Sequence, residues 1–236
     1  MEDVVITSAV RTPMGGFLGD LDIFSAPELG GKAIKGAMEK AGIDRVEEVI
    51  MGNVLGAGQG QAPARQASFA AGLDETVPAT TLNKMCGSGM KAAMIGFDQI
   101  KLGRNQTLAV GGMESMSNAP YLLPKMRSGA RLGHGKVVDH MFLDGLEDAY
   151  EPGRLMGTFA EDCAEKYQFT REAQDEYALT SLENSLSAQK VGAFENEIKT
   201  IEVTDRRGTK SFVSLDEQPQ NARPDKIPFL KPAFRK

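Results

Sequence analysis

Tryptophan is absent from this chain of 236 residues, and cysteine and histidine occur only twice each. Aromatic residues make up 6% of the sequence, so the hydrophobic core must be built mainly from aliphatic side chains. No apolar run approaches the length that spans a bilayer, and we expect no association with a membrane. The N-terminus enters a strand-like run directly, without a basic-then-apolar signal, which predicts no targeting peptide.

The two cysteines, Cys86 and Cys163, are too few for a disulfide framework, and we expect a reducing, cytoplasmic location. With His134 and His140 as its histidines, the chain has no Cys/His cluster that predicts a metal site. The net charge of −5 argues against general nucleic-acid binding, although basic residues gather at 125–136. We therefore expect neither a metal nor a nucleic acid as a partner.

What the sequence does contain is a cysteine flanked by glycine and other small residues, in the stretch NKMCGSGMKA at 83–92. Strand-forming residues precede it, and residues 90–100 have a helical pattern. Such a turn suits a nucleophile, because backbone N–H groups and the positive helix end stabilise a thiolate and small neighbours admit a substrate carbonyl. The alternative is a buried Cys86 that serves as a small hydrophobic residue. Position alone does not decide between the two.

Strand-like and helix-like segments alternate along the first half of the chain. Strands are predicted at 4–10, 48–54, 77–82 and 107–112, and helices at 25–41, 62–72 and after Cys86. Ser25 and Glu28 form a capping box at the start of the first helix, and Gly42 is its predicted stop. This alternation predicts an α/β fold with a mostly parallel sheet flanked by helices.

The pattern changes after residue 116, where a long and poorly periodic stretch begins. Loops of that length tend to be functional. Three further elements are predicted: a helix opened by a capping box of Thr158 and Glu161, a helix capped by Thr170, and a hairpin over 198–214. We therefore divide the chain into two domains, 1–116 and 117–236.

Six motifs together resemble the thiolases, the family of acetyl-CoA acetyltransferases and 3-ketoacyl-CoA thiolases. The stretch around Cys86 is similar to the nucleophile motif of that family. The other matches are RTPMGGF at 11–17, GGMESMS at 111–117, DGL at 144–146, MGTFAE at 156–161 and KPAF at 231–234. The resemblance covers essentially the whole chain and favours the nucleophile interpretation of Cys86. It implies a thiolase-like layered fold, with 1–116 as an N-terminal half that lacks its last strand. Residues 117–236 would be an α+β loop domain for CoA binding and oligomer contacts.

The resemblance implies acyl transfer through an acyl-cysteine thioester. The Cys86 thiolate would attack the keto carbonyl of a 3-ketoacyl-CoA and release acetyl-CoA, and a second CoA thiol would take the acyl group. The reverse reaction condenses two acetyl-CoA molecules into acetoacetyl-CoA. The backbone N–H of Cys86 would donate to the carbonyl oxygen as it gains charge. CoA and acyl-CoA are thus the expected substrates, with no covalently bound cofactor, in a homodimer or homotetramer of fatty acid metabolism.

Other catalytic motifs of the family do not occur in this sequence. These are the Asn-Glu-Ala, Gly-His-Pro and Cys-x-Gly motifs, and neither His134 nor His140 lies in a Gly-His-Pro setting. Cys163 lies within a predicted helix, where packing is its expected role. The resemblance therefore implies the N-terminal half plus loop region of a thiolase, without appreciable thiolysis activity alone. Apolar surface normally covered by a second half would be exposed and promote association.

Five residues are assigned to CoA through the resemblance alone. It implies that Leu146, Met156 and Phe234 line a tunnel for the pantetheine arm and that Arg223 meets the phosphates. Leu155 stands where several family members have a histidine, so its contact departs from the family pattern. From composition alone, Leu146 and Met156 are ordinary core residues and Arg223 is a solvated surface arginine.

Two other functions fit part of the pattern. A ketoacyl synthase shares the fold, but the setting of Cys86 and the MGTFAE stretch argue against it. A non-catalytic CoA-binding or assembly module is the second alternative. CoA binding without acylation of Cys86 would indicate a module, whereas acylation would indicate an enzyme. Acyl chain length and reaction direction stay open.

Overall fold

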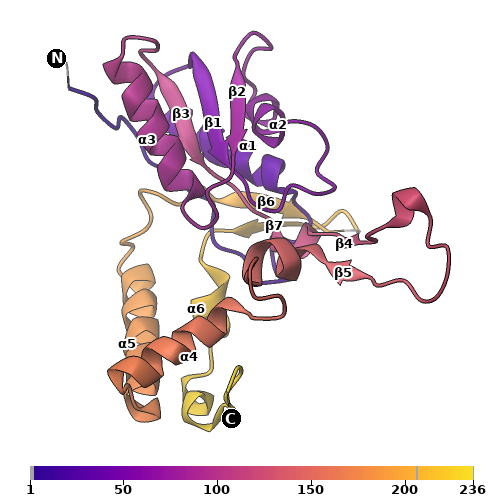
Figure 1. Ribbon diagram of the computed structural model, residues 1–236. Helices are drawn as coiled ribbons and strands as arrows, with labels where there is room; N and C mark the ends of the chain where they lie inside the picture. The colour runs from indigo at the N-terminus through magenta and orange to yellow at the C-terminus, as the bar shows by residue number, and fades with distance from the viewer. Residues whose placement is uncertain (1–2, 206, 236) are drawn as a thin grey trace.

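The computed structural model describes residues 3–205 and 207–235, and its first half is built on a three-stranded parallel sheet (Figure 1). From one edge to the other, the strands are β2 (Ala79–Leu82), β1 (Glu48–Gly52) and β3 (Leu108–Gly112). Helices α1 (Ala26–Ala41), α2 (Pro63–Ala70) and α3 (Ser88–Lys101) alternate with the strands along the chain. The predicted α/β architecture with a parallel sheet is confirmed.

The central strand β1 is buried on both faces. Its residues point alternately to the two faces of the sheet, and helices cover each face. Val49 and Met51 belong to a core that α1 and α2 cover. Gly52 points to the other face, where its Cα meets the first turn of α3. The buried hydrophobic side chains among the described residues are all aliphatic. The absence of tryptophan therefore predicted the character of this core correctly.

Several predicted helix ends are confirmed. Ser25 and Glu28 form the capping box of α1, and Gly42 ends that helix in the left-handed region, with φ of 67°. Thr170 caps the long helix α5 (Arg171–Lys190) by accepting a hydrogen bond from the N–H of Ala173. The predicted hairpin is present as antiparallel β6 (Ile201–Thr204) and β7 (Lys210–Val213).

The strand predicted at 4–10 is not formed. This segment is extended, but Val5 and Ile6 are exposed, and no described strand lies beside it to complete a hydrogen-bonded ladder. Its pairing begins only at Arg11, whose N–H donates to the carbonyl of Glu197 at 2.8 Å. An apolar run predicts strand character correctly only where a neighbouring strand supplies donors and acceptors.

The capping box predicted at Thr158 is also wrong. The N-cap residue of α4 (Met156–Tyr167) is Leu155, three residues before the predicted cap at Thr158. The Thr158 hydroxyl lies inside the first turn and donates to the carbonyl of Leu155 at 2.7 Å. Because a threonine hydroxyl can bond backwards within a helix, the sequence pattern did not distinguish this position from a cap.

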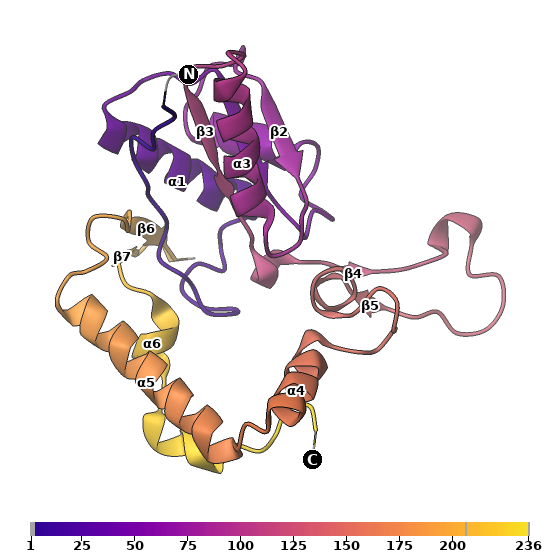
Figure 2. The same ribbon diagram turned by 60° about the vertical axis from the view of Figure 1, so that its left-hand side comes forward.

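The second half of the chain combines the helices α4 and α5 with a series of short elements. In chain order, the elements are η1 (Met116–Asn118), β4 (Tyr121–Leu122), η2 (Met126–Ser128), β5 (Val138–Asp139), the π-helix η3 (Phe142–Leu146), α4, α5, β6, β7, α6 (Glu217–Asn221) and η4 (Pro224–Phe229). Residues between β4 and β5 project from the body as an exposed arm that carries Lys125, Arg127, Arg131 and Lys136 (Figures 1 and 2). The division of the chain at residue 116 stays a prediction. None of the described helices is long and apolar enough to cross a membrane.

The outer face of α3 is apolar and exposed. Met90, Met94 and Phe97 are spaced as one stripe along the helix, and each is at least 48% accessible to solvent. Exposed stripes of this kind are typical of surfaces that meet a partner. The expected association of the chain thus has a structural basis, although association itself stays a prediction.

Candidate functional site

The loops that follow the three parallel strands meet at the carboxyl ends of these strands. The N–H of Asn53, just after β1, donates to the carbonyl of Leu82 at the end of β2 at 3.0 Å. The N–H of Met113, just after β3, donates to Gly52 at 2.9 Å. Ligands of open α/β sheets bind outside the carboxyl ends of the strands. Cys86 follows β2 by four residues and therefore lies at the carboxyl end of the sheet, where a site is expected.

The turn that carries Cys86 is held by side-chain hydrogen bonds. Ser88 is 5% exposed, and its hydroxyl accepts from the N–H of Lys84 at 2.9 Å and donates to the carbonyl of Met85 at 2.6 Å. Asn83 accepts from the N–H of Met85 at 2.9 Å. Together these bonds support Met85 in the left-handed region, with φ of 50°. Cys86 itself is exposed, so its alternative role as a buried hydrophobic residue is wrong.

Glycines let α3 approach the sheet directly behind this turn. A methyl group on Gly52 would lie 2.7 Å from the carbonyl carbon of Ser88 and 2.9 Å from the nitrogen of Gly89. On β3, a methyl group on Gly112 would lie 3.3 Å from the Cα of Gly89. The glycines on both sides of the contact thus set the distance between the sheet edge and the first turn of α3.

Removal of the Ser88 hydroxyl is expected to loosen the turn. In Ser88→Ala, the Lys84 N–H loses its hydroxyl partner and the Met85 carbonyl keeps only the backbone N–H of Ser88 as a donor. We expect the free energy of unfolding to fall by about 0.5–1.5 kcal/mol. Urea denaturation measures this loss. Ser185→Ala is the control, because the Ser185 hydroxyl makes one exposed bond within α5. Equal stability of the two variants would contradict a holding role for Ser88.

Glu114 is a site residue that sequence reasoning did not assign. Its carboxylate accepts from the N–H groups of Val54 at 2.9 Å and Leu55 at 3.1 Å, and from the side-chain amide of Asn53 at 2.8 Å. It therefore anchors the loop after β1 beside the Cys86 turn. Its position just after a predicted strand was the available signal, but the partners lie about sixty residues away in sequence.

His140 is not positioned as a base for Cys86. It is buried, its Nδ1 lies 2.6 Å from a carboxylate oxygen of Asp144, and its Nε2 accepts from the N–H of Ala57 at 3.3 Å. The partners imply the tautomer with the proton on Nδ1. His134 lies on the exposed arm. Cys163 lies in α4 as predicted, but its thiol is exposed, so the expected packing role is wrong for the described residues.

Four of the residues assigned to CoA gather at the start of α4. An antiparallel bridge pairs Glu147 with Leu155. It places Leu146, which precedes Glu147, near Leu155 and Met156 at the start of α4. The ring of Phe234 lies directly against the backbone of Gly157. These residues are Leu146, Leu155, Met156 and Phe234. Met156 and Phe234 are exposed and Leu146 is half-buried, so an ordinary core role is wrong for Met156.

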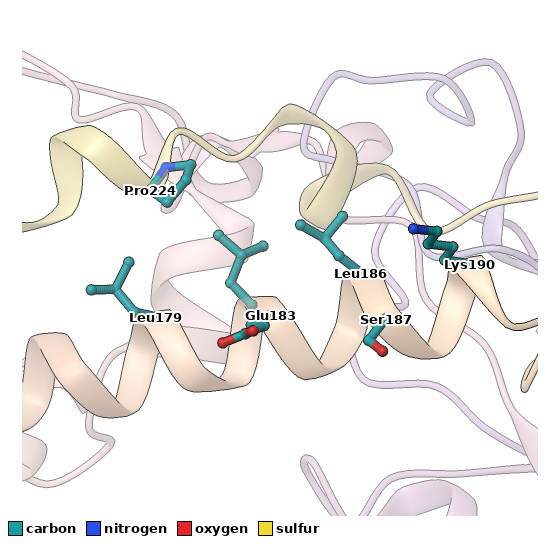
Figure 3. Close-up of a pocket in the computed structure, with 7 residues that line it drawn as sticks. Leu179, Glu183, Leu186, Ser187, Lys190 and Pro224 are labelled. Carbon is teal, nitrogen blue, oxygen red and sulfur yellow. The ribbon is translucent and has the colours of Figure 1, made fainter.

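Arg223 lies apart from that cluster. It is the exposed N-cap residue of η4, and its carbonyl accepts from the N–H of Lys226 at 3.0 Å. Its guanidinium makes no hydrogen bond or ion pair with another described residue. Beside it, a groove of about 470 Å³ runs between α5 and η4, and Figure 3 shows Leu179, Leu186 and Pro224 along it. The groove is mostly aliphatic, with Glu183 and Lys190 on its α5 wall. No group of three or more His, Cys, Asp or Glu side chains in the described part of the chain is placed to hold a metal ion.

Comparison with known proteins shows one consistent similarity. The family description "Thiolase, N-terminal domain" matches residues 4–236. The chain is 49% identical to acetyl-CoA acetyltransferase 2 of Arabidopsis thaliana over 99% of its own length and 58% of that protein. It is 48% identical to the acetyl-CoA acetyltransferase of Pseudomonas aeruginosa, covering 100% of this chain and 61% of that protein.

A solved structure is similar over the full chain. The Acat5 thiolase from Ascaris suum, crystallised in complex with coenzyme A, superposes with a TM-score of 0.90 at 38% identity. The match covers 100% of this chain and 59% of that one. The chain thus spans about three fifths of the length of the relatives that it matches.

Proposed function

Because the chain belongs to the thiolase family, we propose that it supplies the acyl-carrying nucleophile of a thiolase-type acyltransferase. The proposed substrates are acetyl-CoA and acetoacetyl-CoA or another 3-ketoacyl-CoA. The names of its relatives support this assignment, since all those described above are acetyl-CoA acetyltransferases or thiolases. The alternative is a CoA-binding or assembly module that carries out no acyl transfer.

The observation that carries the proposal is the placement of Cys86. Its thiol is exposed on a glycine-flanked turn before α3, at the carboxyl edge of a parallel sheet. In the proposed half-reaction, the sulfur of Cys86 attacks the thioester carbonyl of acetyl-CoA. The new carbon–sulfur bond replaces the bond to CoA, which leaves as a thiol with the proton that Cys86 gives up. The backbone N–H of Cys86 is the proposed donor to the carbonyl oxygen during attack.

The cluster at α4 is the proposed site for the pantetheine arm of CoA. Leu146, Leu155, Met156 and Phe234 offer apolar surface that is partly or largely exposed, which suits a thin, flexible ligand. Arg223, exposed and without an ion-pair partner among the described residues, is the proposed contact of the phosphates. The complex of the similar Ascaris suum thiolase with coenzyme A supports this choice of ligand.

We further propose a homodimer or homotetramer that works in the cytoplasm in fatty acid metabolism. The apolar stripe on α3 and the projecting arm offer surfaces for subunit contacts. The two free and exposed cysteines suit a reducing compartment, because an oxidising one would favour disulfides. Size-exclusion chromatography with light scattering tests the oligomeric state.

Mass spectrometry of the acylated chain tests the proposed function. After incubation with acetyl-CoA, we expect one acetyl group on the peptide that contains Cys86. Cys163→Ser is the matched control, because Cys163 is also a free and exposed thiol; this variant should be acylated like the unmodified chain, and Cys86→Ser should not. Binding of CoA without any acetyl-Cys86 would favour the non-catalytic module.

A further inference from the structure

The carboxylate of Asp162 on α4 bridges two arginines that come from distant parts of the chain. One oxygen contacts the guanidinium of Arg154, which precedes α4, and the other contacts that of Arg235. Each arginine also has a second acidic partner: Arg154 lies 2.7 Å from Glu151, and Arg235 lies 3.1 Å from Glu165. Asp162 is the carboxylate that contacts both arginines and so links Arg154 to Arg235.

Each bridged arginine is adjacent in sequence to residues of the proposed pantetheine site. Arg154 directly precedes Leu155 and Met156, and Arg235 directly follows Phe234. The Arg154 side chain is held further by the Phe159 ring, whose centroid lies 3.7 Å from the guanidinium carbon. Through these arginines, Asp162 connects the segment that carries Leu155 and Met156 with the segment that carries Phe234.

Phe234 depends on this tie because little else covers it. Its ring rests on Gly157, where any side chain would collide with it, yet the residue is 47% exposed. The guanidinium of Arg235 also faces the carbonyl of Thr158, at 3.5 Å, in the first turn of α4. The contacts of the next residue, Arg235, therefore hold the segment that carries the ring against the helix.

We infer that Asp162 is a positioning residue for CoA, which holds Met156 and Phe234 at the separation that the pantetheine arm requires. This inference rests on the proposed function. The three side chains of the bridge are 26% to 45% exposed, and ion pairs so open to solvent contribute little to global stability. A carboxylate that receives two planar guanidinium groups does fix their relative orientation. The role assigned to Asp162 is therefore geometric.

Asp162→Asn tests the inference in the 236-residue chain. This substitution keeps the shape of the side chain and removes the charge that both arginines share. We expect acetylation of Cys86 by acetyl-CoA to slow by about ten-fold, since a small displacement of substrate-positioning groups has effects of this size. Alkylation of Cys86 by iodoacetamide, which needs no pantetheine site, should keep its rate.

Glu165→Gln is the matched control, because Glu165 contacts Arg235 without bridging it to Arg154. It should acetylate Cys86 like the unmodified chain, and Asp162→Glu should recover part of the lost rate. Unchanged acetylation in Asp162→Asn would overturn the inference. Equal losses of acetylation and alkylation would also overturn it, because they would show a general disturbance of the Cys86 turn.

Trypsin separates failure of this inference from failure of the proposed function. If the unmodified chain reacts with iodoacetamide but is never acetylated, the proposed function fails. The bridge is then tested by cleavage after Arg154, compared with cleavage after Arg131 on the exposed arm as an internal reference. Faster cleavage at Arg154 alone in Asp162→Asn supports positioning by the bridge. Unchanged cleavage overturns it.

Discussion

Replacing Asp216 with alanine is expected to lower the free energy of unfolding by about 2–4 kcal/mol. Asp216 is 4% exposed, and its carboxylate accepts from the two terminal nitrogens of Arg11 at 2.7 and 3.0 Å and from the N–H of Met14 at 2.8 Å. Breaking a fully buried ion pair costs about 3–5 kcal/mol. Because the Arg11 side chain is 29% exposed, water compensates for part of that loss.

Asp216 also joins two distant segments. Arg11 belongs to the N-terminal signature, and its guanidinium carbon lies 5.3 Å from the centroid of the Phe194 ring. The next residue, Glu217, accepts from the N–H of Gly16 at 2.7 Å and from that of Asp20 at 2.9 Å. Asp216 and Glu217 thus bind backbone N–H groups of the loop at 14–20. These hydrogen bonds fix the conformation of a glycine-containing segment that forms no helix or strand of its own.

Glu197→Ala is the matched control for this prediction. Glu197 lies 2.7 Å from the same guanidinium, but its side chain is 44% exposed, and we expect a loss below about 1 kcal/mol. Urea denaturation of both variants measures the difference. If the two substitutions destabilised the chain equally, the burial of Asp216 would not be the source of its contribution.

The contribution of Asp216 should also depend on pH. Burial raises the pKa of this carboxyl, but the hydrogen bonds from Arg11 and from the Met14 N–H outweigh burial and hold the pKa below its ordinary value. The stabilisation is therefore complete above the unfolded pKa of about 3.9 and is lost as the pH falls through the lower pKa of the folded chain. Denaturation midpoints below about pH 4 should consequently fall less steeply in Asp216→Asn than in the unmodified chain.

Replacing Gly52 with alanine is expected to slow acetylation of Cys86 by about 100-fold, because a displacement near 1 Å at a reacting group has effects of that size. The added methyl group would lie 2.7 Å from the carbonyl carbon of Ser88 and would also crowd the nitrogen of Gly89. Both are backbone atoms of the first turn of α3, so no side-chain rotation relieves the contact. The turn that carries Cys86 must move away from the sheet edge.

Gly111→Ala is the control for this second prediction. Its methyl group would meet the sulfur of Met51 at 3.4 Å, which is an ordinary contact with a flexible side chain. We expect this variant to keep both its stability and its acetylation rate, whereas overpacking at Gly52 costs about 1–3 kcal/mol. Acetylation in Gly52→Ala at the rate of the unmodified chain would show that the close approach of α3 does not position Cys86.

Local patterns predicted those features whose interactions are close in sequence. The capping box of Ser25 and Glu28, the stop at Gly42 and the cap at Thr170 all involve residues within about one helical turn. The turn around Cys86 was predicted for the same reason, because strand, glycine and helix signals follow one another directly. Its hydrogen bonds through Ser88 span four residues or fewer.

The incorrect predictions at 4–10 and at Thr158 have different causes, one a missing distant partner and the other a competing local hydrogen bond. Residues 4–10 have the composition of a strand, yet no described strand pairs with them. Thr158 has the spacing of a cap, but its hydroxyl bonds within a helix that began at Met156. The gathering of Leu146, Met156 and Phe234 was expected only through the family resemblance, since no local pattern relates positions so far apart.

The sequence by itself determined the alternation of helices with the strands of the parallel sheet, the aliphatic core, the glycine-flanked turn at Cys86 and membership of the thiolase family. Only the tertiary structure decided how the site is held together. Glu114 anchors a loop about sixty residues away, and Arg11 is separated from Asp216 by 205 positions. Carboxylates find their donors by proximity in space, and a single sequence records the residue but not its partner.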